Sequence, residues 1–213
     1  MSTVREKTLW LTRTAIFAAI VVVVQLVGGA VKVGPVSISL VLVPIVIGGI
    51  IMGPASGAVL GLVFGVITLI NGLTGADPFT FILLTSGVKG AIITPLICLV
   101  KATAAGYIAA LIYKLFKNAA NKKPVGHGRD GLKIAGTFMA AAAAPIVNTG
   151  LFILGALTLS DVLAANFVAE GTTVIYFLII GCAGVNFIVE FLVNLVLAPG
   201  IYQIARAVSK GRI

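Results

Sequence analysis

The chain has 213 residues, of which 60% are hydrophobic and only 10% are charged. This composition excludes a soluble globular domain and predicts a membrane protein with several spans. Because apolar runs of about 20 residues each fill the sequence, we expect a single transmembrane domain over residues 1–213 and no separate globular unit.

The net charge of +9 does not indicate nucleic-acid binding, because twelve of the fifteen basic residues lie in three segments that flank apolar runs. They precede the first run, fill the loop that begins near residue 114, and end the chain. An excess of Lys and Arg is typical of cytoplasmic loops. We therefore expect both termini and the middle loop in the cytoplasm, which requires an even number of spans on each side of that loop.

Four spans before the basic loop and two after it satisfy this parity, so we expect an all-α membrane protein with six transmembrane helices. We place the helices at residues 9–27, 38–52, 57–70, 96–116, 132–157 and 180–206. The outer loop of residues 28–37, with its V-K-V-G-P segment, is predicted to form a short turn or hairpin. Gly57, Gly61 and Gly65 open the third helix, and this spacing allows a neighbouring helix to approach closely.

The apolar stretch of residues 79–116 is too long for one straight span. As a single helix it would measure about 57 Å, against a hydrocarbon core of about 30 Å. We expect a break at Ser86-Gly87 or at Thr94-Pro95, with an outer-side segment that lies over the bundle or dips into it. Because non-helical backbone at membrane depth needs protein or water around it, the break indicates a polar region in the outer half.

The last apolar run is also too long, with Gly181 and Gly184 as its predicted breaks. Asn186, Glu190 and Asn194 follow at i, i+4 and i+8, a spacing that stacks them on one helix face. A carboxylate in hydrocarbon costs on the order of 2.5–3.5 kcal/mol on insertion scales, so this face should point toward protein or a watery cavity. An ion pair that locks two helices together is the alternative role for Glu190.

Polar residues inside apolar helices mark ligand pockets or transport pathways by default. Lys101 lies about 22 Å from the cytoplasmic end of its helix, and a cationic group at that depth suits an anionic ligand. Lys89, nearer the outside, has snorkelling to the membrane surface as its alternative role. The candidate substrate-binding residues are Asp77, Lys89, Lys101, Asn148, Thr149, Asn186 and Glu190.

No sequence pattern indicates an enzyme. The chain has no G-x-x-x-x-G-K-[ST] phosphate loop, so it does not hydrolyse ATP by that route, and it has no H-E-x-x-H or G-x-S-x-G motif. Cys98 and Cys182 each stand alone in apolar sequence, and His127 lies in a basic loop. We therefore expect no catalytic residue, metal site or cofactor.

Several stretches, taken together and in order, resemble one family. They are T-R-T-A-I-F-A-A-I from Thr12, V-G-P-V-S-I-S-L-V-L-V-P-I-V-I-G from Val33, G-P-A-S-G-A-V-L-G from Gly53, A-D-P-F-T from Ala76, P-I-V-N-T-G-L-F-I-L-G from Pro145 and N-F-I-V-E-F-L-V-N-L-V-L-A-P from Asn186. They are similar to the substrate-binding membrane subunits, or S components, of energy-coupling factor (ECF) vitamin importers, in the grouping of riboflavin and pantothenate types. The resemblance covers nearly the whole chain.

The resemblance implies a six-helix subunit of the bacterial plasma membrane that captures a water-soluble vitamin from outside, under a lid formed by the loop between the first two helices. It also implies docking onto a transmembrane coupling protein, the T component, which carries two cytoplasmic ATPases. Ala15 and Ala19 would form the docking surface, since small residues at that spacing admit another helix. Internal packing of this pair against Gly57 or Gly61 is the alternative.

One lysine among several amides suits a small ligand with a carboxylate, hydroxyls and an amide, so we expect pantothenate as the cargo. Riboflavin, another vitamin or a precursor is the alternative, although riboflavin invites aromatic stacking and only 8% of the residues are aromatic. A second hypothesis is a self-sufficient, proton-coupled secondary transporter in which Glu190 takes and releases the proton. A third is a structural subunit without a ligand.

Overall fold

The computed structural model describes residues 4–28, 32–33, 36–37 and 40–210. Its helices are α1 (Val4–Gly28), α2 (Leu42–Met52), α3 (Pro54–Leu73), α4 (Pro78–Thr85), α5 (Val88–Asn121), α6 (His127–Leu157), α7 (Ser160–Asn166), α8 (Val174–Tyr176), the π-helix η1 (Phe177–Gly184) and α9 (Val185–Lys210). Strands β1 (Lys32–Val33) and β2 (Val36–Ser37) pair as an antiparallel hairpin in the predicted outer loop. Apart from this hairpin, the regular structure of the described residues is helical, as predicted.

Five helical segments are long and apolar enough to cross a membrane, namely Val4–Gly28, Pro54–Leu73, Val88–Asn121, His127–Leu157 and Val174–Val208. The remaining predicted span corresponds to α2, which has only 11 residues. At 1.5 Å per residue, α2 measures about 16 Å, roughly half of the hydrocarbon core. The chain is therefore a multi-pass helical membrane protein in which one apolar helix has half the usual length.

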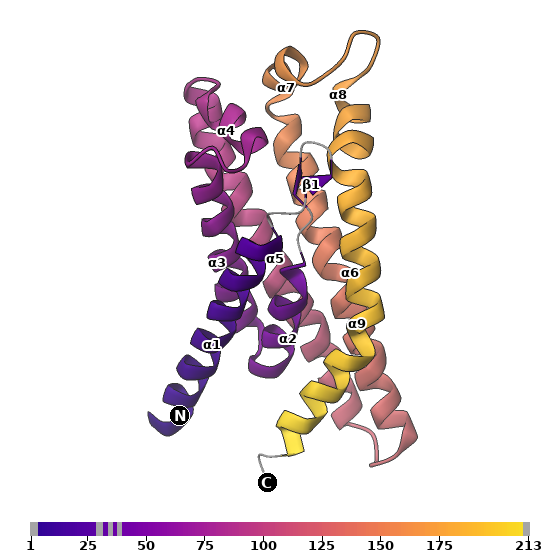
Figure 1. Ribbon diagram of the computed structural model, residues 1–213. Helices are drawn as coiled ribbons and strands as arrows, with labels where there is room; N and C mark the ends of the chain where they lie inside the picture. The colour runs from indigo at the N-terminus through magenta and orange to yellow at the C-terminus, as the bar shows by residue number, and fades with distance from the viewer. Residues whose placement is uncertain (1–3, 29–31, 34–35, 38–39, 211–213) are drawn as a thin grey trace.

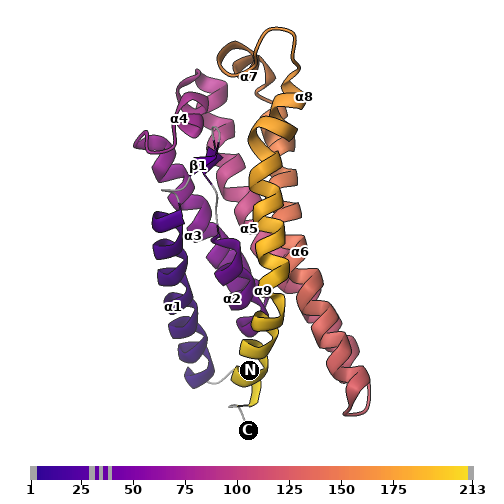
Figure 2. The same ribbon diagram turned by 45° about the vertical axis from the view of Figure 1, so that its right-hand side comes forward.

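The two ends of the bundle carry different elements (Figures 1 and 2). The start of α1, the end of α9 and the α5–α6 connection lie at one end, which we call the terminal end, while α4, α7 and α8 lie at the opposite end. The described parts of the three basic segments therefore gather at the terminal end. Such one-sided placement is typical of membrane proteins that follow the positive-inside rule.

Residues 79–116 form two helices, as predicted. Helix α4 ends at Thr85, and Gly87, with a φ of 99°, precedes α5. This backbone conformation favours glycine, and it places the break at Ser86-Gly87. Pro95 lies inside α5 without interrupting it, so the alternative break at Thr94-Pro95 is wrong.

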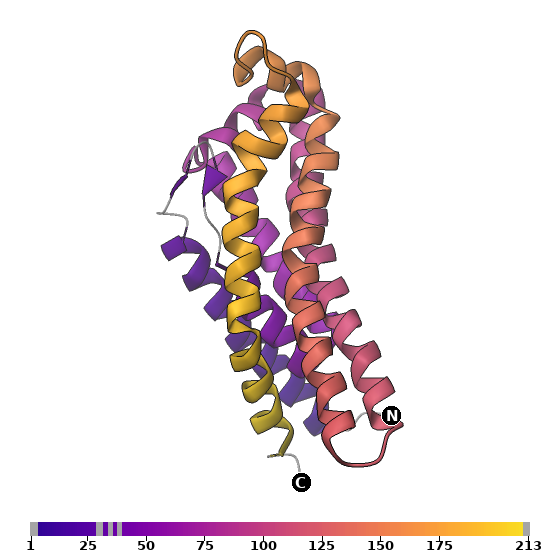
Figure 3. The same cartoon turned by 90° about the vertical axis from the view of Figure 1, so that its right-hand side faces the viewer.

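The predicted break at Gly181 or Gly184 is also wrong. Helix α8, η1 and α9 follow one another without interruption, and both glycines belong to the eight-residue η1. A π-helix keeps its backbone hydrogen bonds in an i→i+5 pattern and frequently marks a functional site. The long apolar run is thus one helix with a widened segment, and Figure 3 shows it running beside α6.

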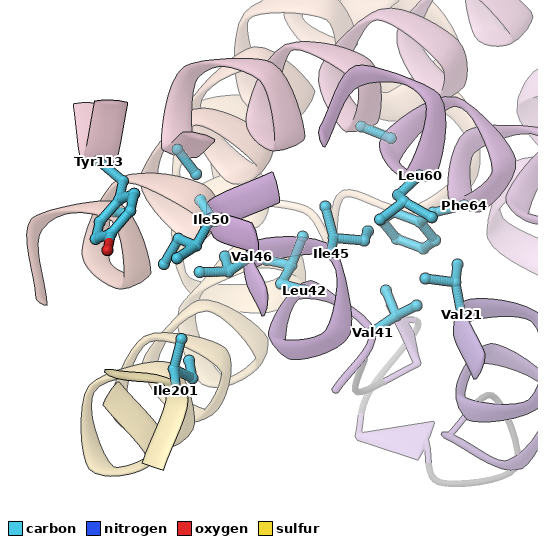
Figure 4. Packing of buried hydrophobic residues seen from close by; sticks show 14 residues of the cluster. Val21, Val41, Leu42, Ile45, Val46, Ile50, Leu60, Phe64, Tyr113 and Ile201 are labelled. Carbon is cyan, nitrogen blue, oxygen red and sulfur yellow. The ribbon is translucent and has the colours of Figure 1, made fainter. Parts of the chain in front are cut away.

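Helix α2 forms the centre of the apolar core. Seven of its eleven residues are buried, and it contacts α1, α3, α5, α6 and α9. Figure 4 shows Leu42, Val46 and Ile50 of α2 between Phe64 of α3 and Ile201 of α9. Because α2 is short, it extends along only part of the length of the bundle. The rest of the bundle interior is not filled by this helix.

The glycine repeat of α3 packs against α5, as its spacing indicated. A Cβ atom at Gly57 would overlap the backbone carbonyl of Gly106, and one at Gly61 would overlap that of Ala102. Gly65 makes a third contact of the same kind with α5. The absence of side chains at these positions therefore lets the two backbones touch.

We expect Gly61→Ala to destabilise the protein, although Gly→Ala inside a helix normally stabilises by about 0.5–1 kcal/mol. The new methyl group would overlap the Ala102 carbonyl, so the expected cost is about 1–3 kcal/mol, as for other overpacked sites. Thermal unfolding of the purified protein in detergent measures the change. Gly150→Ala in α6 is the matched control, because nothing lies within 4 Å of its Cβ position; equal stability of the two variants would contradict the close packing.

Candidate functional site

A cavity of about 320 Å³ lies in the part of the bundle that α2 does not fill. Helices α1, α3, α4, α5, α6 and α9 contribute to its lining, and α2 contributes no residue. The apolar lining includes Phe64, Phe79 and Phe152. The polar lining consists of Gln25, Thr68, Asn71, Asp77, Thr80, Thr94, Lys101, Asn148, Asn186 and Glu190.

Most of the predicted site residues meet at this cavity. Thr149 borders a smaller adjoining space, which also touches Lys101. Lys89 is not brought to either space, because its side chain is exposed at the start of α5. The five that line the main cavity are Asp77, Lys101, Asn148, Asn186 and Glu190.

The polar stripe of the last helix points into the bundle, as predicted. Glu190 is 1% exposed and lines the cavity. Asn194 is fully buried, and its Nδ2 donates a hydrogen bond to the backbone carbonyl oxygen of Glu190 at 2.8 Å. Asn194 does not line the cavity, so the stripe places Asn186 and Glu190 at the site and Asn194 in the helix packing beyond it.

Three charged side chains line the cavity. The Nζ atom of Lys101 lies 5.0 Å from the ring centroid of Phe152, a cation–π arrangement that holds the ammonium group in place. Asp77, in the loop before α4, accepts a hydrogen bond from the Thr80 hydroxyl with an O–O distance of 2.6 Å. With Glu190 as the third, the cavity is lined by one basic side chain, which suits an anionic group, and by two acidic side chains.

Several buried polar atoms of the lining have no hydrogen-bond partner within the described part of the chain. They are the Oδ1 atoms of Asn148 and Asn186 and the Oγ1 atom of Thr94. A buried acceptor that stays unpaired costs about 1–3 kcal/mol. Buried polar groups are paired in most native structures, so these three atoms are exceptions, and all three belong to residues that line the cavity.

Aromatic side chains connect the elements around one side of the cavity. The Phe79 ring of α4 lies 5.9 Å from that of Phe152 on α6 and 5.0 Å from that of Phe167, between centroids. Phe167 in turn stacks on Phe177 of η1 at 5.8 Å. These contacts tie α4, α6 and η1 together, and the rings of Phe79 and Phe152 in this cluster line the cavity.

Some polar residues of the lining were not among the residues predicted from the sequence. Gln25 is 7% exposed near the end of α1. Like Asn186, it is a single polar residue inside an apolar run, so it could have been identified from the sequence in the same way. Thr68 and Thr94 give a weaker signal, because a threonine in a membrane helix commonly bonds to its own backbone. Thr68 does so, with its hydroxyl 3.0 Å from the carbonyl oxygen of Phe64.

The small-residue pair of α1 faces outward. Ala15 and Ala19 are both exposed, and the buried side of the same helix carries Thr14, Val21 and Gln25. The alternative in which the alanines pack inside the chain against Gly57 or Gly61 is wrong, because these glycines pack on α5. The A-x-x-x-A face of α1 is therefore open to another helix or to lipid.

A multi-pass helical bundle that surrounds a cavity with polar lining residues is typical of membrane proteins that bind or move a small solute. The profile of the family described as "ECF transporter, substrate-specific component" matches residues 10–202. The chain belongs to this family, as the resemblance of its motifs indicated. A comparison with curated proteins found none that matches.

Family membership settles the general role of the chain. The substrate-specific component of an ECF importer is a transport subunit and not an enzyme. It binds a small-molecule substrate and works with a T component and ATPases. The cavity is the candidate site for such a substrate.

Proposed function

We propose that the protein captures a small water-soluble vitamin from outside the cell with high affinity and delivers it to a T component with two ATPases. The observation that carries this proposal is the cavity at which Lys101, Asn148, Asn186 and Glu190 meet. Its volume of about 320 Å³ lies at the small end of the range of about 300–1,000 Å³ for ligand sites. A vitamin-sized ligand therefore fits better than a larger one.

In the proposed orientation, the terminal end faces the cytoplasm of a bacterium and the cavity lies toward the outside. The basic residues at the terminal end support this orientation. Helix α2 then counts as the second of six membrane segments, and the β1–β2 hairpin belongs to the proposed lid. Residues 29–31, 34–35 and 38–39 of that loop lie outside the described residues, so the lid rests on the family resemblance.

Pantothenate is the proposed cargo. Its carboxylate matches Lys101, and its hydroxyls and amide match the carboxamides of Asn148 and Asn186 and the carboxylates of Asp77 and Glu190. Riboflavin is the second candidate, because three phenylalanines in the lining offer stacking surface. The small volume of the cavity favours pantothenate over riboflavin.

Calorimetric titration of the detergent-solubilised protein with a panel of water-soluble vitamins tests the proposal. We expect submicromolar binding of pantothenate and at least about 100-fold weaker binding of the others, a difference of about 2.8 kcal/mol. If another vitamin bound more tightly, that vitamin would be the cargo in place of pantothenate, and the proposed function would stand. Absence of submicromolar binding throughout the panel would overturn the function and favour a structural subunit.

A self-sufficient, proton-coupled transporter is the alternative to exclude, since Glu190 is buried at the cavity and buried carboxylates serve as proton relays in such transporters. Liposomes that contain the purified chain alone, under a proton gradient, separate the two. We expect the vitamin to bind without accumulating inside. Gradient-driven accumulation in the absence of partners would favour the secondary transporter.

A further inference from the structure

Helix α1 is held against the bundle along one narrow face. Among its described residues, those that are buried are Thr14, Val21 and Gln25. They follow one another at spacings of seven and four residues, which places them on one side of a helix. The next face around the helix carries Ala15 and Ala19, which are exposed. The direction in which the two alanines point therefore depends on how α1 is rotated about its own axis.

Apolar character alone does not fix this rotation. The exposed side chains of α1 include Ile16 and Ile20, 55% and 41% exposed, and they are as apolar as the buried Val21. In a bilayer the lipid tails are as apolar as these side chains, so no hydrophobic driving force turns one of them inward in preference to another. Close packing and directional polar contacts must therefore set the rotation.

A directional contact joins α1 to the first turn of α3, which runs beside it (Figure 2). The Thr14 hydroxyl donates a hydrogen bond to the backbone carbonyl oxygen of Trp10 at 2.8 Å. Because a hydroxyl has one hydrogen, the Ser56 hydroxyl is the donor to the Oγ1 atom of Thr14, at 2.9 Å. Thr14 is 4% exposed and Ser56 is fully buried, so bulk water does not compete for this bond.

We propose that the Thr14–Ser56 hydrogen bond sets the rotation of α1 and thereby presents the face of Ala15 and Ala19 to the T component. Thr14 and Ser56 are positioning residues, because both are buried and act through the exposed alanines. Turning α1 by one residue, about 100°, would bring the branched Ile16 to this face and hold a partner helix away. This inference rests on the proposed function, since docking on the T component belongs to it.

Thr14→Val tests the proposal, because valine has a similar shape and lacks the hydroxyl. In liposomes that contain the T component and the ATPases, the amount of chain that gives half-maximal uptake of pantothenate, or of a vitamin that binds more tightly, measures docking. We expect Thr14→Val to require about 3- to 10-fold more chain, because only the fraction of molecules with the docking rotation is competent. Thr14→Ser, which keeps the hydroxyl, should dock normally. Vitamin affinity in calorimetry should stay unchanged in both variants.

Thr12→Val is the matched control. The Thr12 hydroxyl donates to the carbonyl oxygen of Thr8 at 2.9 Å, as Thr14 does to Trp10, but Thr12 is exposed. We expect Thr12→Val to dock normally, and an equal loss in this control would contradict the proposal. Ser56→Ala should reproduce the effect of Thr14→Val, and the double variant should lose no more than either single one, because all three remove the same hydrogen bond.

A second measurement reports the rotation of α1 without any partner. Nitroxide labels are attached one at a time at Ala18 and Ala19, after Cys98→Ser and Cys182→Ser, and their relaxation by oxygen is compared. The two positions are neighbours at nearly the same depth, but Ala18 is half-buried and Ala19 is exposed, so oxygen should reach the label at position 19 more readily. We expect Thr14→Val to reduce this difference at least about twofold, because several rotations become populated.

The outcomes separate the inference from the proposed function. Normal docking of Thr14→Val, or an unchanged difference between the two labels, would overturn the inference and leave the function intact. Loss of vitamin affinity in Thr14→Val would show that the hydrogen bond supports the whole bundle, and the positioning role would be wrong. If the unchanged protein showed no uptake with its partners, the function would fail, and the label experiment would still decide whether the hydrogen bond sets the rotation.

Discussion

Lys101→Met is expected to weaken vitamin binding by about 10- to 100-fold. A hydrogen bond to a charged group contributes about 1.5–3 kcal/mol, and each 1.4 kcal/mol changes Kd tenfold. Methionine keeps an unbranched apolar stem against Phe152 and removes only the ammonium group, so the packing of α5 on α6 should survive. Calorimetric titration with the tightest vitamin of the panel measures the loss.

Lys89→Met is the matched control for this experiment. Lys89 lies on the same helix and was a candidate with snorkelling as its alternative role, and its side chain is exposed at the start of α5 and borders neither space. We expect its replacement to leave Kd unchanged. If both variants lost the same affinity, the ligand would bind near the start of α5, and the assignment of the cavity as the vitamin site would be wrong.

The comparison of the two lysines shows why part of the site could be predicted from the sequence. The cost of placing polar groups in hydrocarbon forces them inward, and Lys101, Asn148, Asn186 and Glu190 accordingly line one cavity. A lysine near the end of a helix escapes this constraint, because its long side chain reaches water by itself. Lys89 is such a case.

The shape of the site could not be predicted from composition and residue spacing, because it depends on the length of α2 and on the π-helix η1. The sequence predicted a second span at residues 38–52, but α2 begins only at Leu42, measures about 16 Å and contributes no residue to the cavity. The last apolar run was predicted to break at Gly181 or Gly184 because it is too long for one straight span. In hydrocarbon every backbone group needs an internal partner, so the chain remains helical there and forms η1 instead.

The outward face of α1 leads to the second prediction of large effect: Ala15→Trp should abolish uptake and leave vitamin affinity unchanged. Ala15 is exposed, and α1 reaches the cavity only through Gln25 and Leu26, about 15 Å further along the helix. An indole group at position 15 would hold a partner helix away from a surface that small residues keep smooth. The proposed T component could then no longer dock closely.

Uptake into liposomes that contain the T component and the ATPases measures the effect of Ala15→Trp, and calorimetry on the purified variant measures vitamin affinity. Ile16→Trp is the control, because Ile16 is 55% exposed on the next face of the same helix and should tolerate an indole group with uptake retained. Loss of vitamin binding in Ala15→Trp would mean that Ala15 supports the fold of the bundle. Normal uptake by this variant would place the docking surface on another helix, and the exposed alanines would then face only lipid.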